Sequence, residues 1–325
     1  MRFAVITHPH EKKQVRSAYP FLKQLPEGLV ARLLPYLPAV KIGEITTPEG
    51  STGVVILCPL LPHHFKHLAK KFLQEKIYTC LKKAEKQGAQ VVGLEGLVAT
   101  FLDGSLLQVN PIKASLTTGL RVRTQALLEN VQLIARKKGI RWPQVEVVIL
   151  GPLGQEGETW ITLLARECKR LTLLQTGTKR ELEFVNKIIY ETGLALKVTA
   201  NKQLALANAD IVFIHHLDPA AAIDCTWFKP GSVVCSILPG KGWGDRLCGR
   251  SDVTYIDDTK LIKPAGIAWT VAPEFLTGIS PLLAETIVMA YERDNEWFCP
   301  GREITIRQVE NMAKLAHEHG FQVSI

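Results

Sequence analysis

Short apolar segments alternate with amphipathic segments along most of the chain, which is typical of α/β proteins with largely parallel sheets. In the first part of the chain the strand candidates are the apolar segments 2–6, 53–57 and 90–94. Apolar residues recur at helical spacing between Pro62 and Gly88, so one long helix is predicted between the last two strands. Residues 20–50 are rich in Pro and Gly and predict irregular cover with short elements.

The most informative segment follows a helix predicted over residues 121–138. A β-branched strand at 145–150 leads into glycines at 151, 154 and 157 and then into a helical pattern. In this context backbone amides at a helix N-terminus can hold a pyrophosphate, although the spacing here is GxxGxxG in place of GxGxxG. The residues expected to contact a dinucleotide are Gly151, Gly154, Gln155, Glu156 and Gly157.

The alternation of strands and helices continues beyond this loop. Further strands are predicted at 171–175, 195–199, 210–215, 232–237 and 253–256, with helices at 180–191 and 202–208. Five or six strands after one glycine loop predict a Rossmann-type doubly wound parallel sheet. Two final helices are predicted at 281–292 and 305–319. The expected α/β architecture is a smaller N-terminal substrate domain (1–120), a dinucleotide-binding domain with its linking helix (121–280), and C-terminal helices that return to the first domain (281–325).

The end of the second strand of this sheet bears on the choice of dinucleotide. An acidic residue there would hold the 2′-hydroxyl of NAD, whereas basic residues would accept the 2′-phosphate of NADP. The chain has Thr176, Lys179 and Arg180 at this place and no acidic residue. This favours NADP(H) over NAD(H). The alternative is that Lys179 and Arg180 are solvated side chains at the start of a helix.

The composition describes a folded protein of two domains, with 325 residues, 46% hydrophobic and 22% charged. No apolar run reaches the roughly 18 residues that a membrane span needs, and the N-terminal apolar stretch is too short for a signal peptide. The seven cysteines are scattered and never form a CxxC pair, so neither a disulfide framework nor a zinc ribbon is predicted. We therefore expect a cytosolic protein.

The net charge of +8 is unevenly distributed. Residues 1–140 hold 20 basic and 9 acidic residues, a net charge of +11, whereas the rest hold 19 and 22, a net charge of −3. The basic runs lie on helix-patterned segments without interleaved aromatic residues, which argues against a nucleic-acid partner. The asymmetry also suits a membrane surface, an acidic protein partner such as a carrier protein, or an anionic small molecule.

Two groups of histidines are candidates for chemistry. His63 and His67 share a face at i,i+4 spacing, but no third ligand lies near them in the sequence, so no metal site is expected. His215 and His216 follow the fourth strand of the predicted dinucleotide-binding sheet, where ligands bind in such folds. An imidazole there could donate to a phosphate or a carbonyl, and simple loop filling is the alternative.

Several short motifs, in order along nearly the whole chain, resemble the long-chain acyl-[acyl-carrier-protein] reductases and related predicted amino-acid or shikimate/quinate-type dehydrogenases. These motifs are Leu61-Pro62, Gly93-Leu-Glu-Gly96, Thr117-Thr118-Gly119, Gly139-Ile140, the three glycines after the strand at 145–150, Ala284-Glu285, and Ile304-Thr-Ile-Arg with His319-Gly320-Phe321. The resemblance implies a substrate domain, a central NADPH-binding Rossmann domain, and C-terminal helices that return to the first domain.

The chain departs from this family at two places. The family's nucleophilic cysteine, which forms an acyl-enzyme thioester, aligns with Leu282, and a leucine cannot act as a nucleophile. The polar stretch that follows Thr-Thr-Gly in the family is replaced by Leu120-Arg121-Val122, with Arg123 next. A guanidinium beside the cofactor suits a carboxylate or phosphate better than a neutral acyl chain.

These observations predict an NADP(H)-preferring oxidoreductase that acts on an anionic or carrier-linked carbonyl or imine substrate. Hydride transfer needs one acid for the proton, and the candidates are Lys113, His215 and Lys241. The residues expected to contact substrate are Glu95, Thr117, Thr118, Arg121 and Glu285. The alternatives are a non-catalytic dinucleotide-binding or sensing protein and an acyl-thioester reductase. A homodimer is expected by analogy of fold alone.

Overall fold

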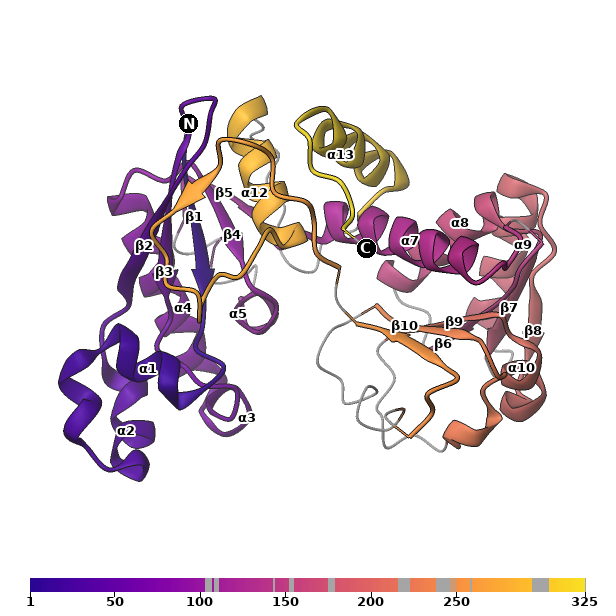
Figure 1. Ribbon diagram of the computed structural model, residues 1–325, viewed down its shortest axis with the longest axis horizontal. Helices are drawn as coiled ribbons and strands as arrows, with labels where there is room; N and C mark the ends of the chain where they lie inside the picture. Colours follow the sequence, from indigo (N-terminus) through magenta and orange to yellow (C-terminus); the bar gives the residue numbers. More distant parts are fainter. Residues whose placement is uncertain are drawn as a thin grey trace. The chain divides into compact units, whose positions relative to one another are not determined.

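The computed structural model describes residues 1–102, 107, 111–142, 144–151, 155–174, 179–215, 223–237, 247, 249–257, 259–293 and 304–324. The chain divides into two compact units. Unit 1 consists of residues 1–123, 260–302 and 312–322, and unit 2 consists of residues 124–259, 303–311 and 323–325. Helices α7 (Leu120–Lys137) and α13 (Ile306–Glu318) contribute residues to both units (Figure 1).

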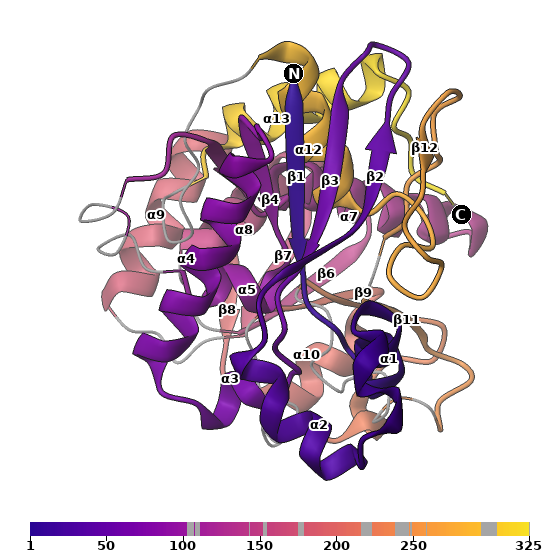
Figure 2. The ribbon, with the colours of Figure 1, turned by 90° about the vertical axis from the view of Figure 1, so that its left-hand side faces the viewer.

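Unit 1 is built on one mixed sheet in the order β12-β2-β3-β1-β4-β5. Its strands are β1 (Arg2–Thr7), β2 (Val40–Thr46), β3 (Thr52–Leu57), β4 (Val91–Leu94), β5 (Ser115–Thr117) and β12 (Ala268–Trp269). The pairs among β3, β1, β4 and β5 are parallel, and β2 pairs antiparallel with both β3 and β12. Figure 2 shows β1, β3 and β2 side by side, with β12 beyond β2.

Helices cover both faces of the sheet in unit 1. They are α1 (Lys12–Ala18), α2 (Glu27–Leu33), α3 (His64–His67), α4 (Lys70–Lys86), α5 (Gly96–Thr100) and α12 (Pro281–Glu292), with 3-10 turns at Pro20–Gln24 and Leu34–Tyr36. The apolar stripe of α4 packs on Ala4 and Ile6 of β1. Helix α12 approaches β4 closely at Gly93. A Cβ atom at Gly93 would overlap the hydroxyl of Thr286 on α12, so glycine permits this close packing of helix on strand.

Two features of unit 1 differ from the sequence-based expectation. The helix predicted from Pro62 is broken, because Leu68 and Ala69 adopt extended backbone angles between α3 and α4. The segment 20–50, expected to be irregular, contains the seven-residue strand β2. Buried and exposed residues do not alternate regularly along β2, so the strand lacks the two-residue pattern typical of a strand. The Pro and Gly residues around it therefore led to the expectation of irregular structure.

Unit 2 is built on an all-parallel sheet in the order β11-β10-β9-β6-β7-β8. Its strands are β6 (Glu146–Leu150), β7 (Arg170–Leu174), β8 (Lys197–Thr199), β9 (Ile211–Ile214), β10 (Val233–Ser236) and β11 (Thr254–Ile256). Numbered within this unit, the order is 3-2-1-4-5-6, which is the order of the Rossmann fold. The predicted doubly wound sheet is therefore confirmed.

Both faces of the sheet in unit 2 are buried. The covering elements are α7, α8 (Gln155–Glu167), α9 (Lys179–Thr192), α10 (Lys202–Asn208) and a 3-10 turn at Cys225–Trp227. Val147 and Ile149 of β6 pack in the core with α7, α8 and α9, whereas Val148 and Leu150 pack in the core with α10. This alternation explains why the strand is apolar throughout. Within the part of the chain that is described, no helix has the length and apolarity needed to cross a membrane.

Candidate functional site

The centre of the sheet in unit 2 is the point where the strand order reverses. From β6 the chain winds outward through β7 and β8, and it then returns to β9 on the other side of β6. Ligands of such sheets bind at the carboxyl ends of the two strands that flank this point. The carboxyl ends of β6 and β9 therefore define the candidate dinucleotide site, and Gly151 and His215 are the first residues beyond them.

Gly151 and His215 are in direct contact. The His215 amide donates to the Leu150 carbonyl over 2.7 Å, which extends the pairing of β6 and β9 past the strand ends. Gly151 has a φ of +130°, and a Cβ atom there would overlap the carbonyl oxygen of His215. Only glycine satisfies both conditions, so the first glycine of the predicted loop is required by the backbone itself. His215 is buried, with 3% of the residue exposed.

The next part of the predicted loop leads into helix α8. Its first residues are Gln155 and Glu156, and Gly157 is buried in its first turn. The remaining predicted contacts Gly154 and Thr176, and the candidate acid Lys241, lie outside the described residues. The helix therefore starts where an anion-binding N-terminus is expected after the first strand of this sheet.

Lys179 and Arg180 open helix α9 and are both exposed. The Lys179 ammonium lies 3.8 Å from Glu183, one turn along the same helix. The Arg180 guanidinium lies 3.1 Å from Glu158 in the first turns of α8. The second basic residue is thus directed towards the helix that begins at the glycine loop, which is the corner where a ribose would lie.

A cavity of about 350 Å³ lies at the opposite edge of this sheet. Its lining includes Lys138, Asp210, Lys229 and Ser232, which lie near the amino ends of β6, β9 and β10. Lys229 is paired with Asp210 at 2.6 Å, and Lys138 donates to the Gly231 carbonyl. Ligands of parallel sheets bind at the carboxyl edge, so this cavity is not part of the candidate site.

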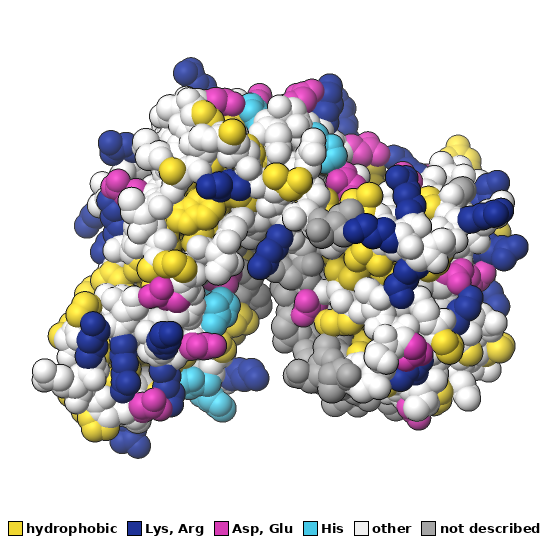
Figure 3. Space-filling model, viewed as in Figure 1, with side chains coloured by type: hydrophobic (Ala, Val, Ile, Leu, Met, Phe, Trp, Pro, Cys, Tyr) yellow, Lys and Arg dark blue, Asp and Glu magenta, His cyan; other side chains and the backbone are white. Residues whose placement is uncertain are grey.

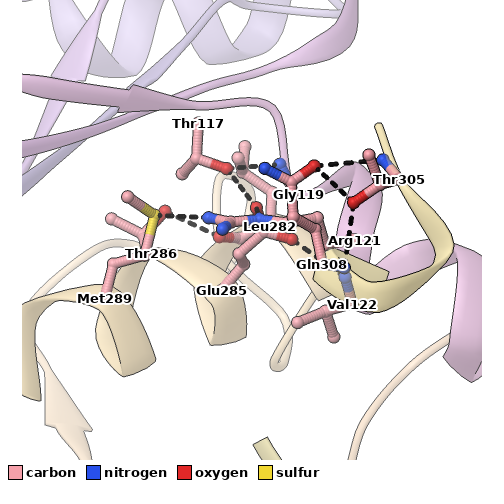
Figure 4. Close-up of polar contacts among 10 residues, drawn as sticks. All are labelled: Thr117, Gly119, Arg121, Val122, Leu282, Glu285, Thr286, Met289, Thr305 and Gln308. Atoms are coloured by element: carbon pink, nitrogen blue, oxygen red, sulfur yellow. Dashed lines mark hydrogen bonds and ion pairs between the residues drawn. The ribbon is translucent and has the colours of Figure 1, made fainter. Parts of the chain in front are cut away.

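In unit 1, three of the residues predicted to contact substrate belong to one buried polar cluster: Thr117, Arg121 and Glu285 of α12 (Figure 4). The Glu285 carboxylate accepts hydrogen bonds from Nε of Arg121 at 3.0 Å, from the Val122 amide at 2.9 Å, and from the Thr117 hydroxyl. The side chains of Arg121 and Glu285 are 5% and 1% exposed. The added hydrogen bonds occupy further lone pairs of the buried carboxylate and so offset part of the desolvation cost of the ion pair.

This cluster changes the role expected of Arg121. The guanidinium is neutralised by Glu285 and also donates to the Met289 sulfur at 3.1 Å. Arg121 and Glu285 therefore hold the start of α7 and the end of β5 against α12. Thr117 is buried in the same network, and Thr118 beside it is half-buried. Contact of these four residues with a substrate stays a prediction.

Leu282 of α12 packs on the same segment. Gly119 has a φ of +72°, and a Cβ atom there would overlap the Leu282 backbone. The described cysteines lie elsewhere, and Cys58 and Cys168 are buried. A hydrogen bond with Cys80 and burial raise the pKa of the Cys58 thiol well above its usual value, and burial raises the pKa of Cys168 to about 12.

Lys113 lies two residues before Ser115, the first residue of β5, and so at the amino end of that strand. Its backbone amide donates to the Glu85 carboxylate, and its side chain is exposed. Thr117 is at the other end of the same strand. Lys113 is thus at the edge of the sheet opposite to the one where ligands of parallel strands bind.

Glu95 lies at the carboxyl edge of unit 1, directly after β4, and the structure brings two histidines to it. Glu95 accepts from the Thr7 hydroxyl and from the His8 amide at 3.1 Å, and its other oxygen lies 2.9 Å from Nε2 of His10. His8 and His10 are not among the site residues predicted from the sequence. The available signal was the sequence His-Pro-His immediately after the first strand, which is adjacent to β4 in the sheet.

The three side chains alter one another's ionisation. Burial of Glu95 alone would raise its pKa, but the hydrogen bond from His10, the nearby imidazoles and the Thr7 hydroxyl together lower it. The hydrogen bond to Glu95 raises the pKa of His10. Burial lowers the pKa of His8. The carboxylate is therefore ionised at neutral pH and held next to two imidazoles of unlike environment.

Comparison with curated proteins identifies a distant relative that covers most of this chain. No protein-family profile matches the chain. The chain is 25% identical over 296 residues to the aminotransferase PigE of Serratia sp. (strain ATCC 39006), a match that covers 88% of the chain and 34% of that protein. The chain thus spans about a third of the length of this relative.

Among solved structures, the chain is similar to L-tryptophan dehydrogenase from Nostoc punctiforme, with 11% identity, a TM-score of 0.40, and coverage of 99% of this chain and 84% of that one. It is also similar to glutamate dehydrogenase from Thermus thermophilus, with 12% identity, a TM-score of 0.37, and coverage of 97% and 74%. Both TM-scores are below 0.5, so the fold assignment rests on the strand order of the chain itself.

Proposed function

We propose that the chain is an NADP(H)-preferring oxidoreductase that acts on a carbonyl or imine carbon of an anionic or carrier-linked substrate. The observation that carries this proposal is the contact of Gly151 with His215 at the switch point of a 3-2-1-4-5-6 sheet. A Cβ atom at Gly151 would overlap the His215 carbonyl oxygen, so glycine allows the chain to turn at this point between β6 and α8. In this proposal the pyrophosphate binds at the start of α8, and Lys179 and Arg180 bind the 2′-phosphate.

When bound, the nicotinamide supplies or accepts the hydride, and the protein must handle one proton. His215 is the candidate for that proton because it lies at the carboxyl end of β9. Lys241 stays a candidate outside the described residues. Lys113 is not retained, because it lies at the amino end of β5. In unit 1, Arg121 and Glu285 are positioning residues in this proposal, and Thr118 and Glu95 remain the candidates for direct contact.

The anionic or carrier-linked substrate is supported by the charge of unit 1. Figure 3 shows Lys and Arg side chains gathered over the end of unit 1 that carries α1 and α2. The exposed basic residues of this segment include Lys13, Lys23 and Arg32. A positive surface of this kind raises the local concentration of an anionic substrate or an acidic carrier protein.

A test of this proposal has two stages. Calorimetric titration with NADPH and NADH measures binding, and we expect NADPH to bind more tightly. Absorbance at the nicotinamide band then measures turnover of keto acids, amino acids and acyl thioesters. Oxidation or reduction of any of these with NADP(H) would support the oxidoreductase, and absence of binding by either dinucleotide would reject it.

The non-catalytic alternative has one observation in its favour. Leu282 occupies the position of the nucleophile in the acyl-carrier-protein reductases that the chain resembles, and its backbone is packed on Gly119. Tight NADPH binding without turnover of any substrate class would support a sensing protein. Turnover of acyl thioesters alone, with a covalent acyl adduct, would instead support a reductase of the thioester type.

A further inference from the structure

His8, His10 and Glu95 form a cluster with the spacing of a metal site. One ligand atom from each residue lies within 4.8 Å of the other two. A tetrahedral ion with ligands at 2.0–2.1 Å requires ligand atoms roughly 3.3 Å apart, so small side-chain rotations bring the three onto one ion. Within the described part of the chain, no other group of three such residues meets this distance.

The local fold aligns these side chains without a metal. Parallel pairing of β1 with β4 places the ends of the two strands side by side, with Ile6 opposite Leu94. Glu95 is then fixed by the Thr7 hydroxyl and the His8 amide. These hydrogen bonds are of the kind that orients a carboxylate ligand from outside the coordination sphere.

The two imidazoles are also oriented. Nδ1 of His8 lies 3.2 Å from the Pro9 carbonyl, and donation to that oxygen leaves the lone pair on Nε2. The ring of Phe65 packs edge-on against His8 at 5.3 Å between centroids. The His8 and His10 rings lie 4.6 Å apart. If the cluster served only to form the ion pair of His10 with Glu95, neither the imidazole of His8 nor its fixed tautomer would be required.

We propose that His8, His10 and Glu95 bind one divalent transition-metal ion, with zinc as the best match to the donor set. Two imidazole nitrogens and one carboxylate oxygen are the ligands of His2Glu zinc sites. Three protein ligands leave a coordination position for water or for a carboxylate or carbonyl oxygen of a small molecule. The site is accessible, because the His10 and Glu95 side chains are 57% and 27% exposed. It shares Glu95 with the substrate contacts proposed above, but it lies in unit 1 and does not depend on the proposed dinucleotide binding.

Metal binding is tested on the full chain after treatment with a chelator. Calorimetric titration with Zn²⁺ is expected to give one bound ion per chain, and Co²⁺ is expected to give the visible absorption bands of a low-symmetry site. Mg²⁺, which prefers six oxygen ligands, is expected to compete poorly. His10→Ala and Glu95→Gln are expected to weaken Zn²⁺ binding more than about 100-fold, since even outer partners of a ligand contribute 10–100-fold.

Two further variants make the test specific. Thr7→Val removes an outer partner of Glu95 and is expected to weaken Zn²⁺ binding about 10–100-fold. The double variant His63→Ala/His67→Ala removes two exposed histidines of the same unit, and its affinity for Zn²⁺ is expected to be unchanged. Thermal unfolding without metal verifies that each variant is folded. Failure to bind Zn²⁺ and Co²⁺, unchanged binding in Glu95→Gln, or loss of binding in the His63/His67 control would each overturn the proposal. NADPH binding, measured on the same samples, reports separately on the oxidoreductase.

Discussion

A side chain at Gly151 would occupy the position of the His215 carbonyl oxygen. Gly151→Ala is therefore expected to separate the carboxyl ends of β6 and β9, in addition to straining a φ of +130°. We expect the free energy of unfolding to fall by at least about 2 kcal/mol and NADPH binding to be lost. Urea denaturation and calorimetry measure the two effects.

Gly193 provides the matched control for this substitution. It also lies in unit 2 with a positive φ, +74°, but a Cβ atom there would meet nothing within 4 Å. Gly193→Ala should cost only about 1 kcal/mol of backbone strain and leave NADPH binding intact. Equal effects of the two substitutions would show that the contact with His215 is unimportant.

The second prediction concerns the buried pair of Arg121 and Glu285. Glu285→Gln leaves the guanidinium without a counter-charge, and we expect the free energy of unfolding to fall by about 3–5 kcal/mol. The double variant Arg121→Met/Glu285→Leu should recover much of this loss, because it removes both charges. The exposed pair Arg166–Glu310 serves as control, and Glu310→Gln should cost less than about 1 kcal/mol. A loss of similar size in both single variants would argue against burial as the cause.

The third prediction is that acyl thioesters do not acylate Cys58 or Cys168. Cys58 is fully buried, and its pKa is raised by its hydrogen bond with Cys80 and by burial. The pKa of Cys168 is about 12, so roughly one thiol in ten thousand is ionised at pH 8. Peptide mass mapping after incubation with acyl-CoA, without NADPH, is expected to show no acyl group on either residue. A stoichiometric acyl group mapped to Cys58 by peptide analysis would restore the thioester mechanism.

The fourth prediction tests the choice of dinucleotide. Lys179→Ala/Arg180→Ala is expected to weaken NADP binding by about 1.5–3 kcal/mol, with a much smaller effect on NAD, because charge-assisted hydrogen bonds to the 2′-phosphate are lost. Lys187→Ala is the matched control, since Lys187 forms an i,i+4 ion pair with Glu191 later in the same helix. Equal losses for NADP and NAD would identify Lys179 and Arg180 as solvated charges.

The fifth prediction is a pH-dependent stability that comes from His64. Burial, and then the neighbouring His63, lower the pKa of His64 to about 4. Its Nδ1 accepts from the Leu61 amide at 3.0 Å, and protonation would destroy that hydrogen bond. Because the folded pKa lies below the unfolded value near 6.5, the stabilisation is complete above pH 6.5. It is lost as the pH falls towards 4, by up to about 3 kcal/mol.

The measurement for His64 is urea denaturation between pH 4 and pH 7. His64→Gln keeps an acceptor and a donor but cannot titrate, so its stability should depend less on pH than that of the unmodified protein. His67→Gln, on the exposed side of the same short helix, serves as control. If the two variants have the same pH dependence, His64 is not the responsible group.

The sequence predicted the central strands of unit 2 well because β6, β9 and β10 are almost entirely buried and apolar on both faces. The helix at 202–208 in unit 2 and the helix at 281–292 in unit 1 have the predicted bounds. The pairing of Arg121 with Glu285 was not predictable, since 164 residues separate them and nothing local indicates the contact. His8 and Glu95 are likewise brought together by the pairing of β1 with β4, which is a property of topology. Local periodicity in the sequence identifies helices and strands. A site formed by residues of strands that are distant in the sequence can be identified only once the order of the strands in the sheet is known.

The composition of unit 1 has a consequence for the order of folding during synthesis. Residues 124–259 of unit 2 are continuous, whereas unit 1 takes its helix α12 from residues 281–292. Until α12 has left the ribosome, Arg121 and Thr117 have no Glu285 to bind, and Gly93 has no Thr286 against it. The sheet of unit 1 therefore lacks α12, and one of its faces stays uncovered, while most of unit 2 is translated and folds. A nascent chain stalled near residue 260 should be recognised by chaperones through that uncovered face.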